Sequence, residues 1–286
     1  MHSLADFAAV LVPVYVCVAG GFLWARIERP VDLSFVSSFV YVVGAPPLVF
    51  AALERAPAGS IPLGTLAEAA VFAIALGGLL AALLSIAAGR RLGASGRALA
   101  LPFAGAMGLS VLRDALGAAA FAQGTVYFAV ATLAAATIGR AAARGRWDMA
   151  SLFGSPIAWG MAAALVLVAV PWTPPKFLVN TANLLGGVVV PVMLIAAGVA
   201  LGRVATGDLL RGLPSGLARL AVGLIAGFVV ADALALDHIA RAVVILETAM
   251  PIAFLWPIYA KSGWNEFAAS LAVGLAALPF LVAYLI

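Results

Sequence analysis

Charged residues are scarce in this chain. Of its 286 residues, 10% are charged, with 16 Lys and Arg and 12 Asp and Glu, and the mean hydropathy is +1.16. A soluble domain typically has about 25% charged residues, which keep its surface hydrated. The shortage excludes an ordinary soluble globular protein, and a hydrophobic share of 65% indicates a chain that is solvated by lipid.

The chain also has a single cysteine, Cys17, and two histidines, His2 and His238, that stand far apart. One cysteine excludes an intrachain disulfide and a thiol-rich metal site, so we expect no metal site and no cofactor. Walker loops, Gly-x-Ser-x-Gly elbows and His-Glu-x-x-His helices are missing from the sequence as well. We therefore expect no enzyme. An intramembrane enzyme or sensor is an alternative that would need a nucleophile or metal cluster at membrane depth.

Long apolar runs fill most of the sequence. A membrane-spanning helix needs about 20 apolar residues. A window of about 19 residues predicts ten spans, near residues 6–25, 33–53, 66–88, 98–118, 123–141, 152–171, 177–201, 214–232, 240–260 and 266–286. The first run is expected to be a retained helix, because no basic residues precede it as they would in a cleavable signal.

Basic residues between the predicted spans are distributed unevenly. Counted on alternate sides, twelve Lys and Arg fall on one side and three on the other, with Arg113 inside a span. Cytoplasmic loops are the more basic ones, so both termini are predicted on the outer side of a cell inner (plasma) membrane. The basic residues behind the net charge of +4 are therefore explained by membrane topology. Aromatic residues are not interleaved with the basic clusters, so we expect a lipid bilayer and no nucleic acid as partner.

Segments of the first half of the chain recur in the second half. Val43–Ala52 is echoed by Val188–Ala197, and Arg97-Ala98 with Ala106-Met107 is echoed by Arg241-Ala242 with Ala249-Met250, each about 144 residues further on. We predict two repeats, residues 1–143 and 144–286. Each would hold five spans, an odd number, so the second must be inverted relative to the first, as in many secondary transporters.

Spans four and nine carry helix-breaking residues at corresponding places, with Pro102 and three small residues in one and Pro251 and Pro257 in the other. Transporters with inverted repeats bind their substrate near the bilayer midplane at such broken helices. We predict that the substrate is bound there and by one Asn of the seventh span: Gly105, Met107, Gly108, Ser110, Thr248, Ala249, Met250, Pro251 and Asn183. Close packing at glycines and simple kinks at prolines are the structural alternative.

Four ionisable residues lie inside predicted spans: Arg113 and Asp114 in the fourth, Arg219 in the eighth and Glu247 in the ninth. Each costs at least about 2.5 kcal/mol at a helix centre in lipid, so each is expected to face protein or a water-filled cavity. Asp114 or Glu247 is predicted to bind a coupling H⁺ or Na⁺, with Arg113 as counter-charge for a carboxylate or an anionic substrate. The alternative is a structural ion pair of Arg113 with Asp114 or Glu247. Arg219 is predicted to snorkel to the membrane surface.

Five stretches carry a family resemblance: Leu11–Tyr15 leading to Gly20-Gly21-Phe22, Ala45–Phe50, Ser155–Ala158, Val190–Leu201, and Ala249–Pro251 followed by Tyr259-Ala260. With them the chain resembles the auxin efflux carrier family, the bacterial relatives of the plant PIN carriers. Bile acid symporters and sodium/proton antiporters share the architecture. The family usually has an Asn in the fourth span and a Pro after a Gly-Leu pair. Here Ser110 follows Gly108-Leu109 and no Asn is near, so the break and the substrate or coupling mode can differ from those of relatives.

The resemblance implies an all-α integral membrane protein of ten helices in two inverted repeats, with crossing broken helices in spans four and nine. It implies a scaffold of spans 1, 2, 6 and 7 and a transport unit of spans 3 to 5 and 8 to 10, which moves in an elevator-type, alternating-access mechanism. The implied substrate is a small organic anion such as auxin, malate or malonate. The coupling ion and a homodimeric assembly stay open, and a Na⁺/H⁺ antiporter without an organic substrate is the alternative function.

Overall fold

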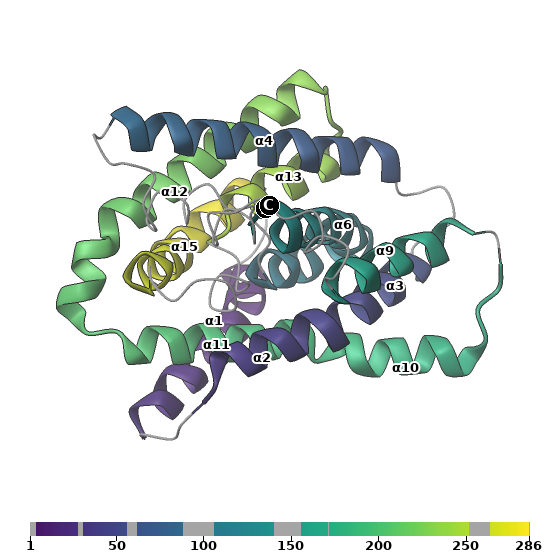
Figure 1. Ribbon diagram of the computed structural model, residues 1–286, viewed down its shortest axis with the longest axis horizontal. Helices are drawn as coiled ribbons and strands as arrows, with labels where there is room; N and C mark the ends of the chain where they lie inside the picture. The colour runs from purple at the N-terminus through teal and green to yellow at the C-terminus, as the bar shows by residue number, and fades with distance from the viewer. Residues whose placement is uncertain are drawn as a thin grey trace.

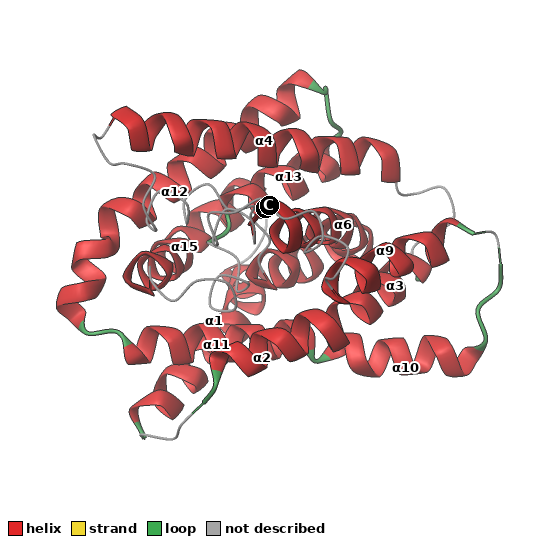
Figure 2. Ribbon diagram, viewed as in Figure 1, coloured by secondary structure: helices red, strands yellow, loops and turns green. Residues whose placement is uncertain are grey.

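The computed structural model describes residues 4–27, 31–55, 62–87, 106–139, 156–170, 172–251 and 264–285. Every regular element in these ranges is helical (Figure 2). Within them, seven segments are long and apolar enough to cross a membrane: Ala5–Arg26, Leu33–Glu54, Leu63–Ala87, Met107–Thr137, Lys176–Arg203, Thr206–Ala233 and Trp264–Leu285. The chain is therefore an all-α membrane protein with several apolar helices. The total of ten spans and their inverted arrangement stay predictions.

The helices correspond to the predicted spans, with one early start. They are α1 (Leu4–Arg26), α2 (Leu33–Phe39), η1 (Val40–Gly44), α3 (Ala45–Glu54), α4 (Leu63–Ala87), α6 (Ala106–Ala134), η2 (Ala135–Gly139), α9 (Pro156–Ala169), α10 (Lys176–Gly187), α11 (Val189–Arg203), α12 (Thr206–Ala233), α13 (His238–Ala249) and α15 (Trp264–Leu285). The span predicted from residue 214 begins at Thr206 instead. Polar first turns, in which Asp208 and Arg211 form an exposed ion pair, extend α12 beyond its apolar stretch.

The fourth and fifth predicted spans meet at a glycine. Within α6, Gly117 has φ 83° and ψ −169°, which interrupts the helix. Residues with a Cβ rarely adopt such a positive φ, so the glycine permits a sharp turn between the segment that starts at Ala106 and the segment that follows. The predicted stretch 98–105 lies outside the described residues.

The second and seventh spans are interrupted at corresponding positions. A five-residue π-helical segment, η1, ends at Gly44, immediately before α3, and Val188 separates α10 from α11. Prolines follow each interruption, at Pro46 and Pro191. A proline lacks the amide hydrogen and clashes with the carbonyl four residues earlier, which accounts for both interruptions. Gly44 and Val188 are 144 residues apart, the spacing at which the two halves of the sequence echo each other, and the internal repeat stays a prediction.

Two groups of helices can be distinguished by their packing. α1 packs on α11, and α3 packs on α10 and α9, whereas α12 packs on α15, α13 and α4, and α6 packs on α13 and α4. Figure 1 shows α4, α12 and α13 along one side of the molecule and α2, α10 and α11 along the opposite side. α6 also contacts α3, α9, α1 and α11, so it lies where the two groups meet.

Small residues allow the closest helix contacts. A Cβ built on Gly21 of α1 would lie 2.8 Å from the carbonyl carbon of Ile195, and one on Gly198 of α11 would lie 2.7 Å from the amide nitrogen of Phe22. Backbones that approach this closely gain van der Waals contact, which drives helix association in lipid. The hydroxyl of Tyr15 donates a 2.7 Å hydrogen bond to the main-chain oxygen of Leu275 and thereby ties α1 to α15.

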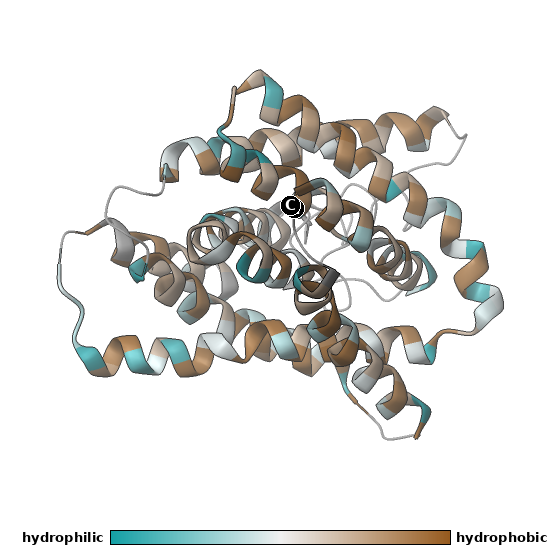
Figure 3. Ribbon diagram, turned by 180° about the vertical axis from the view of Figure 1, so that it is seen from behind, coloured by the Kyte–Doolittle hydropathy of each residue, from teal (hydrophilic) through white to brown (hydrophobic). Residues whose placement is uncertain are grey.

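The outer surfaces of the helices are strongly apolar. Figure 3 shows hydrophobic residues predominating along the helices. Large apolar side chains are exposed on several of them, including Val71 and Leu83 on α4, Trp159 on α9, Ile225 on α12 and Phe280 on α15. Exposed apolar surface of this extent is typical of helices in contact with lipid or a partner, in agreement with the composition.

Candidate functional site

Helix α13 stops inside an apolar span. It ends at Ala249, and the next residue, Met250, is extended with φ −61° and ψ 156°. Pro251 follows, and a proline disfavours the helical conformation of the residue before it. α13 thus ends where the sequence predicts a break in the ninth span. Residues 252–260, its remaining part, lie outside the described residues.

A buried arginine binds the open end of α13. Arg219 of α12 is 1% exposed. Its Nη2 donates hydrogen bonds to the main-chain oxygens of Thr248, at 2.9 Å, and Met250, at 2.7 Å. The last carbonyl groups of a helix have no partner within the helix, and a cation is favoured at that end. The prediction that Arg219 snorkels is wrong, because the carbonyl groups released by the break bind its guanidinium in the protein interior.

α6 crosses α13 at a carboxylate. Glu247 is fully buried, and a Cβ built on Gly108 of α6 would lie 2.8 Å from Cδ of Glu247. One residue further along α13, the Thr248 hydroxyl donates to the carbonyl of Val244 and lies 3.0 Å from the hydroxyl of Tyr127, on the second part of α6. Gly108 has no side chain, and this leaves the space that the Glu247 carboxyl occupies where the two helices cross.

The structure brings most of the predicted substrate-binding residues to this crossing. α13 ends with Thr248 and Ala249, Met250 and Pro251 follow directly, and Gly108 lies against Glu247. Met107 and Ser110 are buried on the same first turns of α6. Gly105 lies outside the described residues. The crossing combines a carboxyl, two hydroxyls and a guanidinium in an apolar interior, which is a set of groups suited to binding a proton or an anion.

Arg113 and Asp114 lie apart from the crossing. Their side chains are 55% and 25% exposed, and Nε of Arg113 lies 2.9 Å from Oδ1 of Asp114. This is the ion pair that we gave as the structural alternative.

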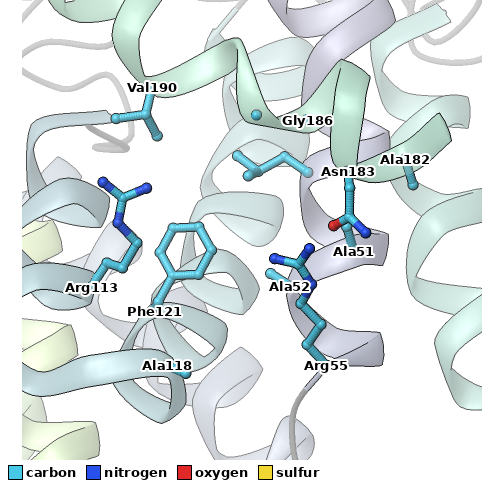
Figure 4. Close-up of a pocket in the computed structure, with 12 residues that line it drawn as sticks. Ala51, Ala52, Arg55, Arg113, Ala118, Phe121, Ala182, Asn183, Gly186 and Val190 are labelled. Carbon is cyan, nitrogen blue, oxygen red and sulfur yellow. The ribbon is translucent and has the colours of Figure 1, made fainter. Parts of the chain in front are cut away.

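A pocket of about 240 Å³ connects Arg113 with Asn183, the predicted residue of the seventh span. Its walls come from both groups of helices: Leu48, Ala51, Ala52, Arg55, Arg113, Ala118, Phe121, Ala182, Asn183, Gly186, Gly187 and Val190. Figure 4 shows the side chains of Arg55 and Arg113 extending into the pocket, with the ring of Phe121 between them in this view. The pocket is apolar apart from two guanidinium groups and one amide, so it is suited to a small anion.

Among the charged and aromatic residues of these two places, four were not predicted from sequence: Arg219 as a buried residue, Tyr127, Arg55 and Phe121. Arg219 and Tyr127 are polar groups inside apolar spans, and that position is the signal that identifies them. Arg55 ends the second span and looks like a loop residue in sequence, because its approach to Arg113 depends on how α3 packs against α6. Among the described residues, no three His, Cys, Asp or Glu side chains are grouped so that they could hold a metal ion.

Comparison with known proteins places the chain among transporters. A protein-family model described as "Membrane transport protein" matches residues 144–285, which is nearly all of the second predicted repeat. No curated protein matches the chain.

Proposed function

Because the chain belongs to the auxin efflux carrier family of membrane transport proteins, we propose that it is a secondary active transporter of a small organic anion. The substrate would be a carboxylate of the size of malate, malonate or auxin. The membrane is proposed to be the cell inner membrane, with both termini on the outer side, since the basic loops alternate accordingly.

One observation carries the proposal: α13 ends at Ala249, where we propose a break in the ninth span, and its end meets a buried arginine and the first turns of α6. Discontinuous helices of this kind bind substrates and ions in secondary transporters. We place the transported anion near the end of α13, where Arg219 supplies a fixed positive charge.

The pocket at Arg55 and Arg113 is proposed as the outer entrance to this site. In the predicted topology Arg55 lies on the outer side, and Arg113 precedes the turn at Gly117 on that side. Two guanidinium groups attract carboxylates and raise their local concentration, while the Nε of Arg113 is already bound by Asp114. The remaining amino groups of Arg113 stay available to a carboxylate.

Movement between two groups of helices would give alternating access. We propose that α1, α2, η1, α3, α9, α10 and α11 form the scaffold, and that α4, α6, η2, α12, α13 and α15 form the transport unit. The packing of α1 on α11, of α3 on α10 and α9, and of α12 on α15, α13 and α4 supports this division, whereas α6 contacts both groups. The pocket is lined by α3, α10 and α11 on one side and by α6 on the other, so its shape would change as the groups move.

A cation antiporter without an organic substrate is the second candidate. The observation that favours it is the complete burial of Glu247 against Gly108, because intramembrane carboxylates often carry protons or ions. The two candidates differ at the pocket: an antiporter would need Glu247 but not Arg55 and Arg113.

Counterflow in proteoliposomes tests the proposal. The purified protein is reconstituted with unlabelled malate, malonate or indole-3-acetate inside, and uptake of the same radiolabelled acid is measured, with the corresponding neutral amides as controls. We expect at least one acid, and none of the amides, to exchange. Failure of every acid to exchange, together with Na⁺ or H⁺ flux through the same vesicles, would favour the antiporter.

A further inference from the structure

Two main-chain oxygens at the end of α13 share one cation. Thr248 O and Met250 O accept hydrogen bonds of 2.9 Å and 2.7 Å from the same Nη2 of Arg219. Carbonyl groups released by an interrupted helix, and helix C-terminal ends, are the groups that coordinate Na⁺ in inverted-repeat transporters. In this protein a side chain of the same charge already binds them.

The guanidinium is held firmly in that place. Arg219 is 1% exposed, and Gly223 lies one turn further along the same face of α12. A Cβ on Gly223 would lie 3.0 Å from Nη1 of Arg219 and 3.0 Å from Cα of Ala249. A Cβ on Gly227, the next turn, would lie 2.9 Å from Cα of Ile245. Because α12 fits so closely along α13, the arginine cannot withdraw unless the two helices separate.

Side chains of both charge signs lie near the end of α13. Glu247 is fully buried one residue before Thr248, and a buried carboxylate needs a nearby positive charge or a proton. Arg219 brings a permanent positive charge to the end of the same helix, where the macrodipole also favours a cation. Tyr127 adds a neutral hydroxyl beside Thr248.

We infer that Arg219 is a positioning residue that occupies the place of a coupling sodium ion, so that this carrier works without Na⁺. The inference rests on the proposed transport function. A sodium ion on the oxygens of Thr248 and Met250 would lie against a guanidinium that already donates to both of them. Coupling, where it exists, then falls to a proton on Glu247.

The test compares Na⁺ with N-methyl-D-glucamine, a cation too large for such a site. Thermal unfolding of the purified wild-type protein is measured in each, and so is acid counterflow in proteoliposomes. Wild-type unfolding temperature and uptake are expected to be the same in both cations, within about twofold for uptake. Arg219→Gln frees the carbonyl oxygens and removes the charge, so Na⁺ is expected to raise its unfolding temperature. Arg219→Lys, which keeps the charge, is expected to show no Na⁺ response.

A rise in the unfolding temperature of the wild-type protein with Na⁺, or uptake that requires Na⁺, would overturn the inference. So would a folded Arg219→Gln protein that ignores Na⁺, because the freed oxygens would then not form a cation site. If Arg219→Gln does not fold, the wild-type comparison decides alone. The unfolding measurement needs no transport, so a wild-type protein that moves no acid would refute the proposed function while the Na⁺ response still tests this inference.

Discussion

Arg219 donates a 2.7 Å hydrogen bond to the main-chain oxygen of Met250, the residue at which α13 stops being helical. Arg219 lies on α12, Met250 directly follows the end of α13, and the two residues are 31 positions apart in the chain. Their contact joins the interruption of a membrane helix to a buried charge, and the proposed site is built around it.

Replacing the proline at the break tests whether the interruption is needed. Pro251→Ala restores an amide hydrogen and removes the restriction on Met250, so we expect α13 to extend and counterflow to fall at least about tenfold, while the protein still inserts and purifies. Pro279→Ala is the matched control, since α15 continues through Pro279 without a break. Wild-type counterflow by Pro251→Ala would refute the assignment of the break.

Neutralising the pocket tests the outer entrance. Arg55→Gln and Arg113→Gln each remove one positive charge from the pocket wall, so each is expected to raise the KM for the acid about tenfold, equivalent to about 1.4 kcal/mol. Arg211→Gln removes an exposed charge from the predicted cytoplasmic side and is expected to change nothing. Equal KM values in the wild-type protein and the three variants would show that the pocket does not bind the substrate.

Glu247 is predicted to be the proton site. Glu247→Gln keeps the shape of the side chain but cannot change its charge, so an inward proton gradient is expected to stop accelerating uptake while acid exchange at symmetric pH persists. The exposed carboxylate of α4 offers a control, Glu68→Gln. Undiminished stimulation by the gradient in the Glu247→Gln protein would move the proton site elsewhere.

Two adjacent glycines of α1 offer a matched test of the packing between α1 and α11. Gly21 lies against the backbone of Ile195, whereas a Cβ on Gly20 meets nothing within 4 Å. Overpacking costs about 1–3 kcal/mol, so Gly21→Ala is expected to lower the unfolding temperature in detergent and Gly20→Ala to leave it unchanged. Equal unfolding temperatures would contradict the observed closeness of the two helices.

Much of the fold follows from patterns that the sequence displays. Apolar runs located the described helices, and Pro251 located the end of α13, because a proline acts on its immediate neighbours wherever it stands. The turn at Gly117 was placed to within a residue by the end of the fourth predicted span. These features depend on local chemistry and the thickness of the bilayer.

The site was harder to predict, because its groups come from distant segments. Arg219 looked like a snorkelling residue near a span end, since sequence gives neither the early start of α12 at Thr206 nor its fit against α13. Arg113 looked like an intramembrane charge, although the turn at Gly117 leaves it exposed beside Asp114. Tertiary packing decides which arginine becomes buried, and the sequence pattern does not reveal this packing.

The central claim is that this protein carries an organic anion, and charge movement measures it most directly. Proteoliposomes on a solid-supported membrane are exposed to malate, malonate and indole-3-acetate at symmetric pH, with and without Na⁺. The account predicts a transient current for at least one acid, with the same amplitude in Na⁺ and in N-methyl-D-glucamine, and a lower apparent affinity for the Arg55→Gln protein. Silence to every acid, with a current on a step in pH or Na⁺, would contradict it.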